Sequence, residues 1–311
     1  MGLSIITPHY NEFEGLKRIY RCLMEQTDTD WEWIIVDDFS DKTFLLKIEA
    51  WIYDIHENRI GFIKNETKSN ASVCRNKGAE RANFENLIFL DADDFISPDF
   101  VLSRAIEFNE FAVFKNTAVR DKNGTQEIKP KLDVNYLNSF LKARFIWQTT
   151  AILWKKSFFM EIGEFDPNLQ RLQDVELTIR ALFAGKNYKI IDNEVDFYYC
   201  TKPISSKPDI VKKSCFSVNL LITKIKSNYT LDAYKHTLIK SYYFACVKGL
   251  HRCKKRGDVV YVKESLRLFY TLKYISTFEH FIGFNLLYLY QYHMISDSLF
   301  IKINRHFFKC S

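Results

Sequence analysis

A cluster of carboxylates follows one apolar run of the chain. The run ends at Leu90, and three acidic residues come within the next four positions: Asp91, Asp93 and Asp94. An unpaired carboxylate is costly to bury, so each must be hydrogen-bonded, ion-paired or metal-bound. Oxygen ligands suit Mg²⁺ and Mn²⁺, which are commonly held by one or two carboxylates together with substrate phosphates. The alternative is an acidic turn ahead of a helix that starts near Ser97.

The elements around this cluster predict an α/β fold. Apolar runs of strand length alternate with amphipathic stretches of helix length, in the chain order 3–7, 12–27, 33–36, 43–57, 60–63, 71–83 and 87–90. Continuous apolar strands that alternate with helices are typical of an open, mostly parallel sheet. Such sheets bind their ligands beyond the carboxyl ends of the strands.

Polar residues stand at three of these strand ends, namely Thr7 to Tyr10, Asp37 with Asp38, and Asp91 to Asp94. A nucleotide is the expected occupant of that edge. The chain has only ten glycines, and none forms a G-x-G-x-x-G fingerprint or a P-loop. The phosphates must therefore be neutralised in another way, and a cation at Asp93 with help from Arg75 would do so.

Several motifs in a fixed order carry a family resemblance. They are Ile6–Asn11, Ile35–Ser40, Ser72–Gly78, Phe89–Asp94, Ile162–Asp166 and Gln173–Leu177. Over about residues 1–200 the chain resembles the family-two inverting glycosyltransferases, which have the GT-A fold. The resemblance implies a Rossmann-like, mostly parallel open sheet with flanking helices. It also implies a glycosyltransferase of the hexosyltransferase class that uses a nucleotide-sugar.

The same resemblance implies which residues bind the nucleotide. Thr7, Pro8 and Tyr10 would line the pocket for the base and ribose. Asp38 would bind the uracil ring, and Arg75 would lie near the base and the phosphates.

The remaining roles that the resemblance implies concern the metal and the chemistry. Asp91 and Asp93 would form the D-x-D motif that holds ribose and a Mn²⁺ or Mg²⁺ ion, with Asp94 beside the metal. Asp174 would be the catalytic base that accepts the proton of the acceptor hydroxyl. One base and one metal support a single displacement with inversion, whereas glycosidases need a pair of carboxylates. Asp174 could also be a helix N-cap, with Leu177 as the first buried position.

Three positions depart from the family pattern. Asn70 replaces a frequent glycine, and we expect it to adopt the left-handed backbone angles that asparagine tolerates. Cys74 replaces a frequent alanine and is expected to be a small buried residue. Gln173 stands where an acidic residue commonly precedes the base, which leaves the acceptor class open.

Composition predicts a globular protein with reduced thiols. Of the 311 residues, 47% are hydrophobic and 26% are charged, which excludes general disorder. The seven cysteines are scattered, odd in number and contain no C-x-x-C, so neither a disulfide framework nor a zinc site is expected. Residues 1–7 lack the features of a signal peptide, and we expect a cytoplasmic protein.

The last third of the chain is basic and has a helical pattern. Residues 201–311 hold 19 Lys and Arg against 6 Asp and Glu, a net charge of +13, so residues 1–200 carry −7 of the total of +6. We expect a catalytic domain over 1–205 and a helical region over 206–311, with helices at 214–228, 232–250 and 258–275 and a basic linker from His251 to Arg256. The uncharged run 280–296 is too short and polar for a transmembrane helix.

Three roles for this basic region remain open. Basic, aromatic amphipathic helices suit the anionic inner face of the cell membrane, to which the protein would bind peripherally. The region could instead cap the catalytic domain or form a homodimer. Nucleic acid is not an expected partner, because no known module pattern occurs.

The expected function is transfer of a sugar from a UDP-sugar to a glycan or a polyprenyl-linked oligosaccharide in cell-surface polysaccharide synthesis. One alternative is a sugar-nucleotide pyrophosphorylase, but that class needs a glycine-rich basic loop where this chain has Pro8 to Glu12. Another is an inactive module that binds glycan or membrane. Such a module would be expected to lack Asp93 or Asp174, and both are present.

Overall fold

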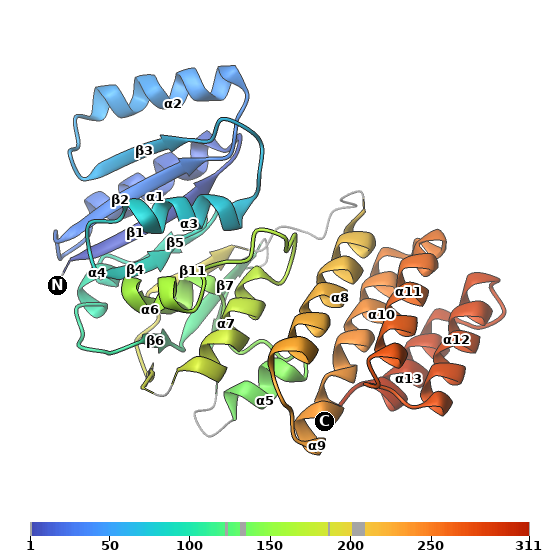
Figure 1. Cartoon of the computed structure of the whole chain (residues 1–311). Coiled ribbons are helices and arrows are strands. Elements are labelled where there is room, and N and C mark those ends of the chain that lie inside the picture. The colour runs from blue at the N-terminus through green and yellow to red at the C-terminus, as the bar shows by residue number, and fades with distance from the viewer. Residues whose placement is uncertain (1, 122–123, 131–134, 186, 201–208, 311) are drawn as a thin grey trace. The chain divides into compact units, whose positions relative to one another are not determined.

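The computed structural model describes residues 2–121, 124–130, 135–185, 187–200 and 209–310 (Figure 1). The chain forms two compact units made of interleaved segments. The first, here called the sheet unit, comprises Met1–Val134, Ile146–Pro167 and Arg180–Pro203. The second, the helical unit, comprises Asn135–Phe145, Asn168–Ile179 and Ile204–Ser311. The sequence predicts a boundary between a catalytic domain and a helical region at residues 205 and 206. These two residues lie outside the described part of the chain, so this boundary stays a prediction.

A seven-stranded sheet forms the centre of the sheet unit, with the strand order β10-β6-β9-β4-β1-β2-β3. The strands are β1 (Leu3–His9), β2 (Trp31–Asp37), β3 (Ile60–Lys64), β4 (Asn86–Phe89), β6 (Phe111–Phe114), β9 (Ile152–Lys155) and β10 (Lys189–Ile191). Only β9 is antiparallel to its neighbours, β4 and β6. The predicted mostly parallel sheet is thus confirmed, and so are its first four strands.

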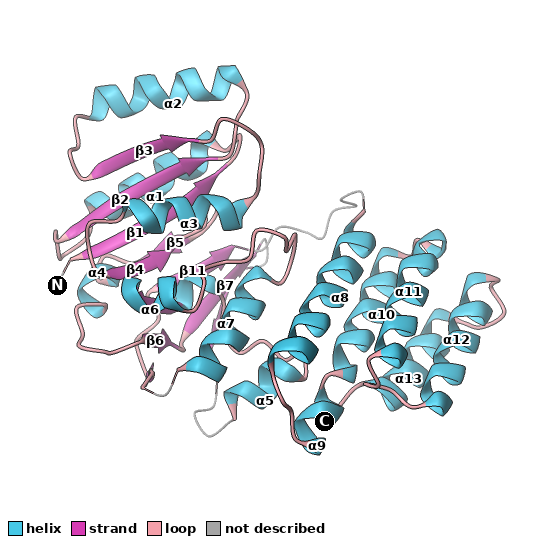
Figure 2. Cartoon of the chain, viewed as in Figure 1, coloured by secondary structure: helices cyan, strands magenta, loops and turns pink. Residues whose placement is uncertain are grey.

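Helices α1 (Phe13–Met24), α2 (Lys42–Ile55) and α3 (Ala71–Arg81) also confirm the predicted alternation (Figure 2). Successive strand residues point to opposite faces of a sheet. On one face Ile5 and Ile35 share a core with Leu16 of α1. On the other face Gly78 of α3 lies against Ile6. Both faces are therefore covered, which explains why the strands are apolar without alternation.

A second, four-stranded sheet was not expected from the sequence. It consists of β5 (Phe95–Ile96), β7 (Thr117–Asp121), β8 (Gly124–Ile128) and β11 (Phe197–Cys200), in the order β5-β11-β7-β8. The short β5 follows the acidic cluster directly and pairs with β11 through Ile96 and Phe197. The unit also contains α4 (Phe100–Ser103), η1 (Thr149–Ala151) and α6 (Lys156–Glu161). The acidic cluster is thus held between one strand of each sheet.

The helical unit contains the predicted helices and others that were not predicted. Its elements are α5 (Tyr136–Leu141), α8 (Ile210–Asn228), α9 (Ala233–Leu238), α10 (Lys240–Cys253), η2 (Arg256–Asp258), α11 (Val259–Thr271), α12 (Thr277–Gln291) and α13 (Asp297–Phe308). The helix predicted over 232–250 is divided into α9 and α10, and α13 was missed. The boundary between the two units falls inside α7 (Gln173–Ala184).

Helix α10 forms the centre of the helical unit and packs against α8, α11 and α13 (Figure 1). Tyr242, Tyr243 and Val247 are fully buried, which explains why this helix is apolar on several sides. The basic linker expected at His251–Arg256 is wrong in part, because α10 extends to Cys253 and Arg256 begins η2. Among the described residues, no helix is long and apolar enough to cross a membrane.

The close approach of α3 to the sheet generates a test. A Cβ atom at Gly78 would lie 2.4 Å from Ile6 Cγ2, whereas one at Gly249 in α10 would meet nothing within 4 Å. Gly78→Ala should therefore lower the free energy of unfolding by about 1–3 kcal/mol through overpacking. Gly249→Ala should leave it unchanged or raise it, because alanine favours a helix. Urea unfolding measures both, and equal stability of the two variants would contradict this packing.

Candidate active site

The parallel register brings three strand ends to one edge of the large sheet. His9 at the end of β1 lies opposite Asp37 at the end of β2, and Ile6 lies opposite Phe89 at the end of β4. Asp38 and the cluster from Asp91 to Asp94 follow directly. This is the edge at which ligands of parallel sheets bind.

The residues after β1 differ in how far they reach the surface. Thr7 is fully buried, and its Oγ1 accepts a hydrogen bond of 2.9 Å from the indole nitrogen of Trp33. Pro8 is half-buried beside β2. Tyr10 has 48% of its surface exposed, and the ammonium of Lys68 lies 3.1 Å from the centre of its ring. Of the three, Tyr10 is the side chain that presents a face to solvent.

Asp38 is buried and held by four hydrogen-bond donors. Its carboxylate accepts the backbone N–H and hydroxyl of Ser69 at 2.8 and 2.5 Å and the amide of Asn65 at 3.2 Å. The ammonium of Lys68 lies 2.8 Å away. Burial raises the pKa of Asp38, but the hydrogen bonds from Lys68, Ser69 and Asn65 outweigh it and lower that pKa below its ordinary value. Asp38 is therefore an oriented anion.

A buried network beside Asp38 fixes the loop after β1. His9 Nδ1 lies 2.7 Å from Asp37, and His9 Nε2 accepts the backbone N–H of Glu12 at 3.0 Å. An acceptor at Nε2 requires the neutral tautomer with its proton on Nδ1. Asp37 also accepts the backbone N–H of Ser40 at 2.8 Å. Asp37 thus satisfies a backbone donor just beyond the strand end.

Contacts from two helices position the D-x-D loop. Asp91 accepts a hydrogen bond of 2.6 Å from the guanidinium of Arg75 in α3. The carbonyl of Ala92 accepts one of 3.0 Å from Arg18 in α1. A Cβ atom on Gly15 would lie 2.2 Å from that same carbonyl oxygen, so glycine lets α1 approach the loop.

The third carboxylate of the cluster faces inward. Asp94 is 1% exposed and accepts the backbone N–H of Cys200 in β11 at 3.0 Å. Burial, together with the negative charges of Asp91 and Asp93, raises the pKa of Asp94 to about 8. The cluster is thus an accumulation of negative charge at a strand end, which a divalent cation would relieve.

No three His, Cys, Asp or Glu side chains are arranged to hold a metal ion anywhere in the described part of the chain. Asp91 is bound to Arg75, and Asp94 to the backbone of β11. Asp93 is half-buried at the strand end. This arrangement fits a cation that takes most of its oxygen ligands from a substrate's phosphates rather than from the protein.

Asp174 belongs to the helical unit, whereas every expected nucleotide-binding residue belongs to the sheet unit. It lies in the first turn of α7, which begins at Gln173, so the alternative that it is the N-cap is wrong. The first buried position of that helix is Val175 rather than Leu177. The neighbouring Glu176 is buried and forms an ion pair of 2.7 Å with Lys224 of α8.

The three departures from the family pattern have local explanations. Asn70 is extended, with φ −164°, and caps α3 by accepting the backbone N–H of Val73 at 3.2 Å, so the expected left-handed conformation is wrong. Cys74 is fully buried, as predicted, and burial with the charge of Asp38 raises its pKa to about 12. The side-chain amide of Gln173 donates to the carbonyl of Leu169 at 2.7 Å.

Sequence reasoning missed several residues that build the site. Asn65 and Lys68 follow β3 and hold Asp38, so the rule that polar residues gather at strand ends could have identified them. Gly15 and Arg18 of α1 lie far from the cluster in sequence. The local sequence around Gly15 and Arg18 does not reveal that these residues contact the Ala92 carbonyl.

Comparison with known proteins identifies the family. The family model described as "Glycosyl transferase family 2" matches residues 4–163. The chain belongs to glycosyl transferase family 2. The amylovoran biosynthesis glycosyltransferase AmsB of Erwinia amylovora is 27% identical over 252 residues, covering 76% of this chain and 83% of AmsB. The putative teichuronic acid biosynthesis glycosyltransferase TuaG of Bacillus subtilis is 35% identical over 106 residues, covering 34% of this chain and 41% of TuaG.

Solved structures confirm the fold of this glycosyltransferase. Residues 1–349 of S. aureus TarS, in complex with UDP-GlcNAc, superpose with a TM-score of 0.68 at 15% identity, covering 98% of this chain and 91% of that one. GalNAc-T7 with UDP, GalNAc and Mn²⁺ gives a TM-score of 0.56 at 16% identity, covering 79% and 51%. The predicted GT-A fold is confirmed, and the family match confirms that the protein is a glycosyltransferase.

The lowered pKa of Asp38 predicts a pH dependence of stability. A carboxylate with a depressed folded-state pKa stabilises the protein above its unfolded pKa, about 3.9, and that contribution is lost as the pH falls through the folded value. Asp38→Asn should therefore destabilise the protein at pH 7, and the difference from the natural chain should shrink below about pH 4. Urea unfolding between pH 7 and 3 measures it. The exposed Asp54 provides the control Asp54→Asn, and a difference for Asp38→Asn that does not vary with pH would count against this role.

Proposed function

We propose that this glycosyltransferase moves a sugar from a UDP-sugar, with inversion, to a glycan or a polyprenyl-linked oligosaccharide during synthesis of a cell-surface polysaccharide. The observation that carries the proposal is the set of oriented carboxylates at one sheet edge: Asp38, Asp91 and the adjacent Asp93. The relatives named for amylovoran and teichuronic acid synthesis support the polysaccharide context. The UDP-GlcNAc complex of TarS supports the donor class.

In this proposal the nucleotide binds along the carboxyl ends of β1, β2 and β4. The oriented carboxylate of Asp38 suits the ring N–H of uracil, which is a hydrogen-bond donor. The exposed face of Tyr10 offers a surface for the base, and Thr7 and Pro8 form the wall behind it. Arg75 holds Asp91 in place for the ribose hydroxyls and adds positive charge for the phosphates.

The metal would be Mn²⁺ or Mg²⁺, held by Asp93 and the donor's diphosphate, with Asp91 and Asp94 beside it. When bound, such an ion supplies Lewis-acid stabilisation of the departing diphosphate. The negative charges of Asp91 and Asp93 beside the buried Asp94 support a cation at this position. The protein's own contribution is to hold the loop rigid through Arg18 and Arg75.

Asp174 is the proposed base for the acceptor hydroxyl. Its place in the motif from Gln173 to Leu177 supports this role, as does its place in the first turn of α7. Glu176 is the nearest alternative in sequence. Its carboxylate is 4% exposed and paired with Lys224, which fits a structural role.

Asp93→Asn tests the metal assignment. It removes a negative ligand without changing shape, so affinity for the UDP-sugar in the presence of Mn²⁺ should fall sharply while thermal stability is kept. Isothermal titration with UDP-sugar and Mn²⁺ measures the effect, and Asp54→Asn is the matched surface control. Undiminished affinity in Asp93→Asn would refute the assignment.

Asp174→Asn tests the base. Donor binding should be unchanged, and transfer should fall by about two to four orders of magnitude, the usual contribution of a general base. Glu176→Gln is the control, because it removes the pair with Lys224 and should lower stability more than turnover. Near-normal transfer by Asp174→Asn would show that another residue accepts the proton.

We also propose that the protein is cytoplasmic and binds the inner face of the membrane peripherally. Helix α12 and its C-cap residue carry exposed aromatic side chains at spacings of three or four, which place them on one side of the helix: Phe278, Phe281, Phe284, Tyr288 and, at the C-cap, Tyr292. This aromatic face of α12 suits the headgroup boundary of a bilayer. Lys254 and Lys255, in the turn between α10 and η2, are exposed as well. Arg256 is engaged with the Tyr290 carbonyl and Asp297, so it serves the fold instead.

The membrane proposal predicts sedimentation with anionic liposomes, weakened by high salt because exposed charges are screened. Phe278→Ser with Phe281→Ser should weaken it, as should Lys254→Glu with Lys255→Glu, without changing donor hydrolysis. Tyr53→Ser, at an exposed aromatic of α2, is the control. Absence of sedimentation at low salt would favour a cap or a homodimer interface instead.

A further inference from the structure

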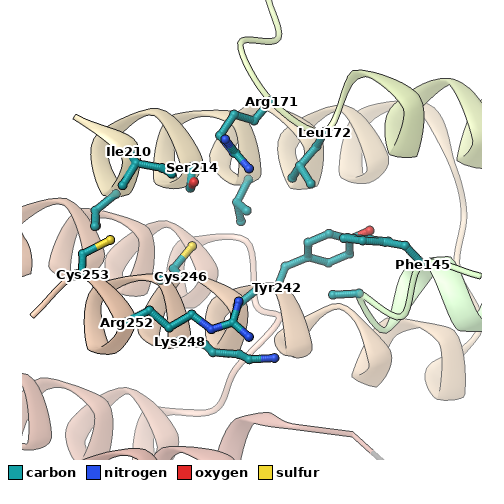
Figure 3. A pocket seen from close by; sticks show the side chains of 15 residues that line it. Phe145, Arg171, Leu172, Ile210, Ser214, Tyr242, Cys246, Lys248, Arg252 and Cys253 are labelled. Atoms are coloured by element: carbon teal, nitrogen blue, oxygen red, sulfur yellow. The ribbon is translucent and has the colours of Figure 1, made fainter. Parts of the chain in front are cut away.

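The helical unit contains a cavity of about 440 Å³ (Figure 3). Its walls come from α8 and α10, from the turn after α5 and from the residues just before α7. All of these belong to the helical unit. The volume lies within the range of small-molecule sites in proteins.

Most of the wall is apolar. Phe145 is exposed and Leu172 and Ile210 are half-buried where they line the cavity, whereas Val211, Val218 and Tyr242 are almost completely buried. The ring of Phe145 lies 6.3 Å from that of Tyr242, centre to centre. The hydroxyl of Tyr242 donates to the carbonyl of Phe140. An aliphatic chain fits such a surface.

Three cations also line the cavity. Arg171 enters from the segment before α7, and Lys248 and Arg252, one helical turn apart, come from α10 (Figure 3). In the described residues, none of the three side chains has a carboxylate within ion-pair distance. Partial burial, with the positive charges of Arg252, Lys309 and Arg305, lowers the pKa of Lys248. Uncompensated positive charge of this kind attracts an anion.

The cavity also lies close to the proposed base within the same unit. Leu172 lines the cavity and precedes Asp174 by two residues. Besides burial, the charge of Asp174 raises the pKa of Tyr242, another lining residue. Leu172 and Ala143, both in the wall, adopt left-handed backbone angles with φ of 61° and 54°. At Ala143 this is the ordinary left-handed end of α5, where the backbone N–H of Arg144 donates to the carbonyl of Ser139. Leu172 lies directly before α7, and such angles are uncommon for leucine.

We propose that this cavity binds the lipid phosphate part of a polyprenyl-linked acceptor, with the hydrocarbon chain against Phe145, Leu172 and Ile210 and the phosphate among Arg171, Lys248 and Arg252. The proposal rests on the proposed function, and it specifies the acceptor class that the motifs leave open. A neutral glycan alone would use neither the apolar wall nor the cations. A free phosphate would use only the cations.

Binding of farnesyl phosphate, below its critical micelle concentration, tests the proposal with the full chain. Farnesyl phosphate should bind at least about tenfold more tightly than farnesol or inorganic phosphate, because only it uses both parts of the cavity. Arg252→Gln should weaken its binding about tenfold or more, and Ala245→Trp should block the cavity irrespective of charge. The matched control is Arg267→Gln, at an exposed arginine of α11 outside the cavity.

Two further measurements distinguish a failure of the cavity from a failure of the membrane surface or of the donor site. Phe278→Ser with Phe281→Ser should bind farnesyl phosphate normally, since the aromatic face of α12 is a different surface. UDP-sugar binding should be unchanged in Arg252→Gln, so failure of the donor site would be seen independently of the cavity. Equal affinity of Arg252→Gln and Arg267→Gln for farnesyl phosphate would overturn the proposal, as would binding of inorganic phosphate alone with the same affinity.

Discussion

The crowding of negative charge at the end of β4 is the constraint around which the sheet unit is built. Three carboxylates follow a fully buried strand, and their mutual repulsion is relieved by contacts from different parts of the chain. Arg75 of α3 binds Asp91, and the backbone of β11 binds Asp94. Arg18 of α1 holds the intervening carbonyl of Ala92. Each contact comes from a different element. The small sheet, α1 and α3 together hold the loop from Asp91 to Asp94 in place.

Local patterns predicted the parts of the fold that depend on local chemistry. Uninterrupted apolar runs identified β1 to β4, because strands covered on both faces need no polar alternation. The small sheet was missed because β5 has two residues and β8 is wholly exposed, so neither carries a hydrophobic period. Helix α13 was missed although Phe300 and Phe308 are buried. These residues are buried by packing against α10, a tertiary contact that the local sequence does not reveal.

The sequence predicted the candidate site only in part, as it did the fold. Strand-end position identified Asp38 and the acidic cluster, and the family resemblance supplied the role of Asp174. The donors that orient Asp38 arise after β3, through a loop whose course is a tertiary property. The cavity of the helical unit depends on residues from four separate segments. No sequence motif contains these four segments. The anion-binding chemistry proposed for the cavity can therefore be recognised only in the folded chain.

The central claim is that the nucleotide binds at the sheet edge formed by β1, β2 and β4. A crystal structure of the chain with UDP and Mn²⁺ tests it most directly, because manganese can be located by its anomalous scattering. The account predicts an anomalous peak between Asp93 and the diphosphate, with the uracil ring against Asp38. Density for UDP elsewhere on the chain, or a manganese ion bound away from Asp93, would contradict it.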